Sequence, residues 1–66
     1  MRINDLFAKW RSDNHLTQKE AAELIGISQG TYSRFEKYGV AGMKTEALIQ
    51  NYYIGNKSEF GGEVNV

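Results

Sequence analysis

Hydrophobic residues recur at helical spacing from the start of the chain. Ile3, Leu6, Phe7 and Trp10 occupy positions i, i+3, i+4 and i+7, which form one face of an amphipathic helix. This spacing predicts a first helix over residues 3–13, with its apolar face turned towards a core.

Two further helices are predicted on either side of Gly26. A capping-box pattern over residues 17–20 places the start of the second helix at Gln18. Gly26 ends that helix, because glycine tolerates the left-handed backbone that a sharp exit needs. Ser28 is a good N-cap for a third helix, which we expect to run to about Lys37.

The C-terminal third of the chain has a less regular pattern. Residues 38–42 contain two glycines and predict a loop, and residues 44–53 predict a fourth helix. Residues 56–66 have no helical period and predict a flexible tail or a short strand that reaches a partner subunit. The expected fold is all-α: a compact four- or five-helix bundle over residues 1–55, followed by this tail.

The composition argues against several classes of protein. A chain of 66 residues has room for one small domain. It has no cysteine and only one histidine, His15, which leaves a metal site little support and fits a reducing cytoplasm. No apolar run approaches the roughly 20 residues of a membrane span. No catalytic constellation emerges, so we expect no enzyme activity, no cofactor and no small-molecule ligand.

The charge balance argues mildly against DNA binding, because DNA-binding domains are often basic. Eight basic and eight acidic residues give a formal net charge of zero. Residues 1–57 hold eight basic and six acidic groups, a net charge of +2. Any positive face must therefore come from the placement of the charges.

The stretch from Leu16 to Lys37 carries the most specific pattern in the chain. It resembles the phage repressor and Cro-type helix-turn-helix family through Leu16-Thr17-Gln18, Ala22, Gly26-Ile27-Ser28 and Tyr32-Ser33-Arg34-Phe35-Glu36-Lys37. The similarity extends over residues 3–54. It implies a small transcriptional regulator that places its third helix in the major groove of DNA.

Polar side chains on the third helix are the candidates for reading base edges. Gln29 can present its amide to adenine, and Arg34 can bind O6 and N7 of guanine. Thr31 and Ser33 are candidates for a base edge, a thymine methyl group or a phosphate, and are otherwise solvated surface residues. Gly30 costs about 1 kcal/mol relative to alanine. It either lets the backbone approach DNA closely or is a tolerated weakness of the helix.

The resemblance also implies contacts to the DNA backbone and one structural ion pair. The family glutamine at the start of the second helix contacts a phosphate, and Gln18 matches it. An arginine near the end of the first helix pairs with the glutamate that closes the third, and Arg11 and Glu36 match these two. Candidates for ionic contacts to phosphates, or else for simple solubilising charges, are Lys19, Lys37 and Lys44.

Members of this family commonly dimerise through the last helix and the C-terminal segment. The matching candidates are Leu48, Ile49, Tyr52, Tyr53 and Phe60, with Val64 and Val66 on a possible strand. The alternative is that Leu48 and Tyr52 complete the core of a single chain.

Together these features predict a sequence-specific regulator of transcription that binds double-stranded DNA. We expect a cytoplasmic homodimeric repressor of phage or mobile-element type, autoregulatory, bound to an inverted-repeat operator. The alternative is a protein-interaction module with the same fold, such as an antitoxin subunit or an anti-regulator. The near-zero net charge and Gly30 keep that alternative open.

Overall fold

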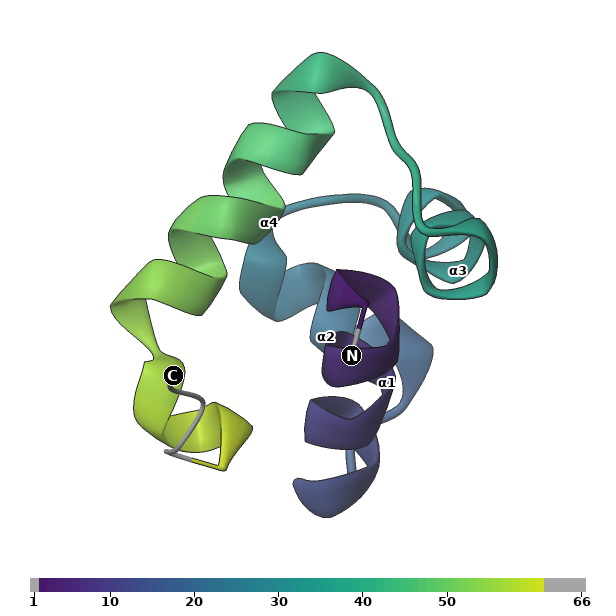
Figure 1. Ribbon diagram of the computed structural model, residues 1–66. Helices are drawn as coiled ribbons and strands as arrows, with labels where there is room; N and C mark the ends of the chain where they lie inside the picture. The colour runs from purple at the N-terminus through teal and green to yellow at the C-terminus, as the bar shows by residue number, and fades with distance from the viewer. Residues whose placement is uncertain (1, 62–66) are drawn as a thin grey trace.

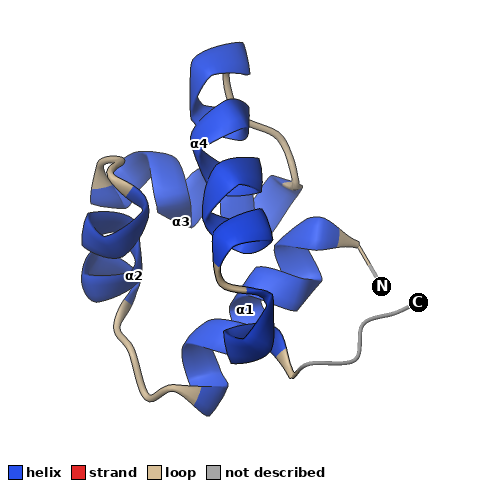
Figure 2. Ribbon diagram, turned by 90° about the vertical axis from the view of Figure 1, so that its left-hand side faces the viewer, coloured by secondary structure: helices blue, strands red, loops and turns tan. Residues whose placement is uncertain are grey.

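Helices account for most of the chain in the computed structural model, which describes residues 2–61 (Figures 1 and 2). Their bounds are α1 Ile3–Asp13, α2 Gln18–Ile25, α3 Gln29–Tyr38, α4 Met43–Gly55 and a 3-10 helix, η1, Lys57–Phe60. The described residues contain no strand, and the all-α prediction is confirmed. Val64 and Val66 lie outside the described residues.

The end of α1 is closed by a left-handed residue, as a Schellman motif requires. His15 has φ 56°, and its amide N–H donates to the carbonyl of Ser12 over 3.1 Å. The amide of Leu16 donates to the carbonyl of Arg11 over 2.9 Å. His15 is exposed, so the single histidine terminates a helix at the surface of the molecule.

The α2–α3 turn follows the local signals of the sequence. Thr17 and Glu20 form the capping box at the start of α2. Gly26 then adopts φ 94°, and the carbonyl of Ala22 accepts the amides of both Gly26 and the next residue. The hydroxyl of Ser28 caps α3, which runs one residue beyond the predicted end. Ala22 is buried, which allows α2 and α3 to pack closely.

A core rich in aromatic rings holds the helices together. The ring of Phe7 on α1 packs edge-on against Trp10, Phe35 and Phe60. The buried hydrophobic residues come from all five elements: Phe7, Trp10, Ala21, Ala22, Ile25, Tyr32, Phe35, Ile49 and Phe60. A large share of aromatic volume compensates for the two alanines on α2.

The C-terminal segment differs from the prediction. Residues 57–60 form η1 instead of a flexible tail or strand, and α4 is longer than the predicted 44–53. Phe60 is only 7% exposed, and its ring stacks on Trp10 at 5.2 Å between centroids. Glu59 accepts hydrogen bonds from Trp10 Nε1 and from the Tyr52 hydroxyl, over 3.2 and 2.9 Å. These contacts turn the chain back from α4 onto α1 (Figure 1).

Candidate nucleic-acid interface

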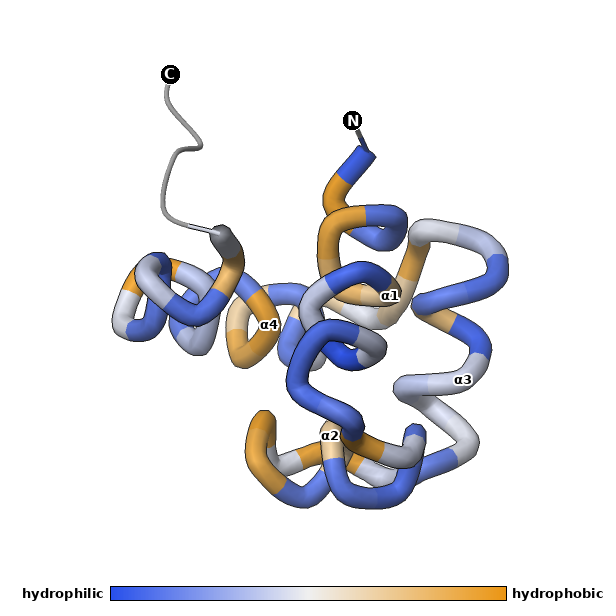
Figure 3. Tube along the Cα trace, turned by 90° about the horizontal axis from the view of Figure 1, so that it is seen from below, coloured by the Kyte–Doolittle hydropathy of each residue, from blue (hydrophilic) through white to orange (hydrophobic). Residues whose placement is uncertain are grey.

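Helix α3 is anchored by one face and leaves a polar face outward. Tyr32 and Phe35 are buried in the core, whereas Gln29 and Arg34 are exposed. Thr31 and Ser33 lie half-buried between the two faces. Along most of α3 the residues are hydrophilic or neutral (Figure 3). The buried face therefore fixes this helix to the core, and the opposite face is open to a ligand.

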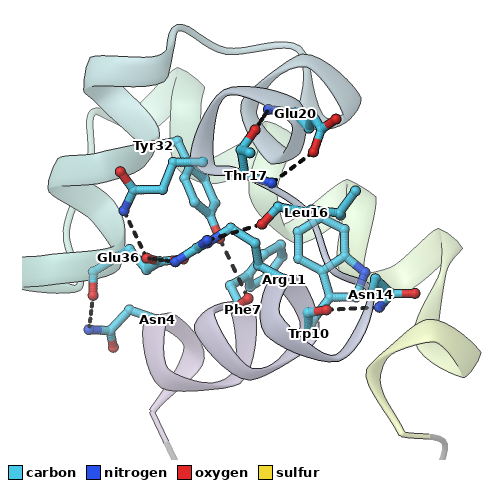
Figure 4. A network of polar contacts seen from close by, with 11 residues as sticks. Asn4, Phe7, Trp10, Arg11, Asn14, Leu16, Thr17, Glu20, Tyr32 and Glu36 are labelled. Atoms are coloured by element: carbon cyan, nitrogen blue, oxygen red, sulfur yellow. Dashed lines mark hydrogen bonds and ion pairs between the residues drawn. The ribbon is translucent and has the colours of Figure 1, made fainter.

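The carboxylate of Glu36 joins α3 to both preceding helices (Figure 4). Arg11 on α1 binds it with two donors, Nε to Oε2 at 2.8 Å and Nη2 to Oε1 at 3.0 Å. The Gln18 amide at the start of α2 donates to Oε1 over 2.9 Å, and the Tyr32 hydroxyl donates to Oε2 over 2.7 Å. Arg11 and Glu36 thus form the pair that the family resemblance implied, within a larger network. The network sets how α1, α2 and α3 lie against one another.

This environment keeps Glu36 ionised. Burial raises the pKa of the Glu36 carboxyl, but hydrogen bonds from Arg11, Tyr32 and Gln18 outweigh it, and the net pKa is lowered. Burial, followed by the hydrogen bond to Glu36, raises the pKa of the Tyr32 hydroxyl. The hydrogen bond to Glu36 also raises the pKa of Arg11. At neutral pH the network holds one carboxylate, one guanidinium and a neutral phenol.

Asn4 at the start of α1 and Arg2 before it form a clamp on the C-terminal end of α3. The sequence did not predict this clamp. Asn4 is buried, and its Nδ2 donates to the backbone carbonyl of Glu36 over 3.1 Å. Arg2 Nη2 lies 3.4 Å from the carbonyl oxygen of Tyr38. A signal was available, because Asn4 shares the face of Phe7 and Arg11 at positions i, i+3 and i+7. Donors at the C-terminal end of a helix satisfy carbonyls that have no partner within the helix.

A family model for the helix-turn-helix matches residues 7–41. The match runs from α1 through α2 and α3 into the following loop, and so includes the network around Glu36. The chain belongs to the Cro/C1-type helix-turn-helix family. Comparison with curated proteins finds no match, and comparison with solved structures finds none either. The family is one of DNA-binding regulators, and this protein is a DNA-binding helix-turn-helix regulator in that general sense.

The predicted phosphate contacts lie on α2, α3 and α4. Lys19 is exposed in the first turn of α2, Lys37 in the last turn of α3 and Lys44 in the first turn of α4. Within residues 2–61, none of these three lysines forms an ion pair. Gln18 of this helix-turn-helix uses one amide N–H on Glu36. Its second side-chain N–H and the backbone amides of Gln18 and Lys19 remain as donors, whereas the amide of Glu20 is taken by Thr17 Oγ1.

The predicted dimer contacts require a correction. Ile49 and Phe60 are buried in the core of the single chain, so neither has surface to offer a second subunit. Tyr52 and Tyr53 are half-buried and pack against Trp10 and Phe60, respectively. The physical reason is that η1 folds back and completes the core with these side chains. Among the five candidates, the one still exposed is Leu48.

Other apolar side chains are exposed on α4. Met43 is 88% exposed and Ile54 63% exposed, and Ala47 lies between them on the same helix. We call Met43, Ala47, Leu48 and Ile54 the outer α4 face. Part of it borders a hollow of about 370 Å³, whose floor includes Phe35 and Ile49. None of the described helices is long and apolar enough to cross a membrane.

Proposed function

We propose that this protein is a sequence-specific regulator of transcription that inserts α3 into the major groove of double-stranded DNA. The observation that carries this proposal is the exposed polar face of α3 on a helix whose C-terminal part is fixed to α1 and α2. Glu36 ties it to α1 and α2, and Asn4 binds its last turn. A reading helix held in this way loses little conformational freedom on binding, which favours affinity and specificity.

Reading and positioning are divided among different side chains in this proposal. Gln29 and Arg34 on the exposed face contact base edges, where amide and guanidinium donors discriminate between base pairs. Gln18, Lys19, Lys37 and Lys44 contact phosphates beside the groove and set the register of the protein on the duplex. The zero net charge then matters less than the unpaired lysines on the helices next to the groove.

We propose that the protein acts as a homodimer on an inverted repeat. Successive major-groove faces lie roughly 34 Å apart on one side of the duplex. The described part of one chain spans 28 Å along its longest axis, so one chain reaches a single half-site. The outer α4 face is the apolar surface that a second copy would cover. Occupancy of an operator near a promoter would repress transcription, and control by the protein's own concentration would make it autoregulatory, as in phages or mobile elements.

Two observations also favour an alternative, a protein-interaction module of the antitoxin or anti-regulator type. The same outer α4 face presents exposed apolar side chains that a different protein would cover, and the net charge of zero gives no general attraction to DNA. In this alternative Arg34 has no role in binding.

The test is fluorescence anisotropy of the whole chain against a duplex selected from random DNA and against its scrambled version, over a range of salt concentrations. Specific binders prefer their site by about 10³-fold or more, and affinity falls with salt as phosphates are neutralised. Arg34→Ala should remove the preference, whereas Lys57→Ala removes the same charge from η1 and should keep it. Weak and equal binding to both duplexes would overturn the proposal. Capture of a protein partner by the Arg34→Ala variant, without DNA, would favour the interaction module.

A further inference from the structure

The side chain of Arg34 lies back over the first turn of α3. A β-carbon built on Gly30 would lie 3.8 Å from Arg34 Nη1, and, apart from its chain neighbours and the backbone of its own helix, no other atom comes within 4 Å of it. The second terminal nitrogen, Nη2, donates to the hydroxyl oxygen of Thr31 over 3.5 Å. Long side chains in helices lean towards the N-terminus, which carries this guanidinium from the second turn to the first. The first turn of a reading helix is the part that contacts base edges.

The hydroxyl of Thr31 is itself held in place. Ser28 Oγ donates to Thr31 Oγ1 over 2.7 Å and accepts the backbone amide of Thr31 over 3.2 Å. Thr31 Oγ1 therefore accepts from both Ser28 and Arg34, which occupies its two lone pairs. Its own hydroxyl hydrogen is left to donate outward. The N-cap of the helix thus orients Thr31, and Thr31 orients Arg34.

The Arg34 guanidinium and the Thr31 hydroxyl together therefore offer a ligand hydrogen-bond donors only. A guanidinium has no acceptor, and the Thr31 oxygen has no free lone pair. In the major groove guanine shows two neighbouring acceptors, N7 and O6, and no donor. Adenine pairs one acceptor with a donor, cytosine shows a donor, and thymine shows one acceptor beside a methyl group. A pair of adjacent donors matches guanine and disfavours the other three bases.

We propose that Arg34 and Thr31 act as one donor pair that reads a guanine in each half-site, with the guanidinium seated beside Gly30 over the first turn of α3. This inference rests on the proposed function. Position 30 then contributes to specificity, since a side chain larger than alanine there would displace Arg34. Thr31 has two roles, as a positioning residue for Arg34 and as a donor to the same base.

The alternative reading of Gly30, a close approach of backbone and DNA, makes a different prediction. Alanine fits the seat, because its β-carbon would make ordinary van der Waals contact with Arg34. Gly30→Ala should therefore keep both affinity and base preference, and should raise the midpoint of thermal unfolding. Gly30→Val extends further from the backbone and should displace the guanidinium. If close approach were the reason for glycine, alanine alone would weaken binding to every duplex by a similar factor.

The experiment uses the selected duplex with each guanine replaced in turn by 7-deazaguanine, which lacks the N7 acceptor. We expect the wild-type affinity to fall about 5- to 100-fold at one guanine per half-site. Arg34→Ala, Thr31→Val and Gly30→Val should bind the unmodified duplex more weakly and become insensitive to this replacement. Thr31→Ser, which keeps the hydroxyl, and Gly30→Ala should remain sensitive. A wild-type protein that is insensitive at every guanine would overturn the proposal.

A measurement without DNA separates this inference from the proposed function. In the free protein, nuclear Overhauser contacts are expected between the α-protons of Gly30 and the δ-protons of Arg34, and they should weaken in Thr31→Val. Their absence would overturn the seat, even if the protein binds an operator. If the contacts are present but no duplex is ever selected, the proposed function fails and the guanine reading fails with it.

Discussion

Gly39 is subject to two constraints, its backbone conformation and its close neighbours. An added β-carbon would conflict with both. Its φ of 81° is a left-handed conformation, and an added β-carbon would lie 2.8 Å from Arg2 Nη2 and 3.2 Å from Asn4 Oδ1. Asn4 is buried and bonded to α3, so it has little freedom to move. The close packing of α1 against the end of α3 therefore depends on the absence of a side chain here.

We predict that Gly39→Ala lowers the free energy of unfolding by about 2 kcal/mol or more, through backbone strain and displacement of the clamp. Gly26→Ala adds strain at φ 94° without any close neighbour and should cost about 1 kcal/mol. Gly55→Ala, with neither constraint, should be neutral or stabilising. Urea denaturation of the three variants measures the order. Equal losses for Gly39→Ala and Gly26→Ala would show that the neighbours of Gly39 yield easily.

Glu36 should make the stability of the protein sensitive to acid. Its carboxyl has a lowered pKa in the folded state, so the unfolded chain takes up the proton first as the pH falls. The stabilisation is complete above the ordinary pKa of about 4.5 and is lost as the pH falls through the lower folded-state pKa. At neutral pH the network contributes fully.

We predict that Glu36→Gln is about 2 kcal/mol less stable than the wild type at pH 7, between the values for exposed and buried pairs. Its stability should fall less steeply than that of the wild type below pH 4.5. Thermal unfolding between pH 3 and pH 7 measures both. Glu23→Gln, an exposed change outside the network, should follow the wild type. Parallel acid profiles for Glu36→Gln and the wild type would contradict the assignment to Glu36.

At the scale of elements, η1 acts as part of the core although it has only four residues. Its contribution comes from Phe60, which touches rings on α1 and α4. In a domain of this size each buried ring is a large share of the total apolar burial.

We predict that Phe60→Ala lowers the free energy of unfolding by about 3 kcal/mol, the usual cost of removing a buried phenylalanine. Ser58→Ala, an exposed change in the same element, should stay within about 0.5 kcal/mol of the wild type. The tryptophan fluorescence of Trp10, which stacks on Phe60, reports both the unfolding and the loss of the contact. A Phe60→Ala variant as stable as the wild type would mean that η1 adds little to the core.

For the whole molecule, the proposed dimer depends on the outer α4 face. We predict that Met43→Lys combined with Ile54→Lys gives a monomer by sedimentation equilibrium, because two buried charges would oppose association. Both side chains are highly exposed in the single chain, so the helical circular dichroism should not change. Leu24→Lys on α2, also exposed, should leave the dimer intact. If the double variant remains a dimer, the second subunit binds elsewhere.

Helix caps and helix bounds that depend on a few neighbouring residues could be predicted from the sequence. The capping box at Thr17 and Glu20, the N-cap at Ser28 and the left-handed Gly26 place the helix-turn-helix, because each acts on the backbone of its immediate neighbours. The bounds of α1 followed from its apolar period, because its two faces differ clearly in polarity. The family followed from these signals, and so did the proposal that α3 reads DNA.

Contacts between distant segments required the tertiary structure. Residues of α4 are apolar on several faces, so sequence alone could not decide that Ile49 faces the core and Met43 faces solvent. The burial of Phe60 depended on the ring of Trp10, which is fifty residues away in the chain. The centroids of the two rings are 5.2 Å apart. The bond from Gln18 to Glu36 and the clamp of Asn4 on α3 depended in the same way on the packing of helices. The sequence by itself therefore determined where α1, α2 and α3 lie in the chain, since capping and periodicity are local. Only the fold decided which side chains are left free to bind a partner, since burial depends on the whole chain.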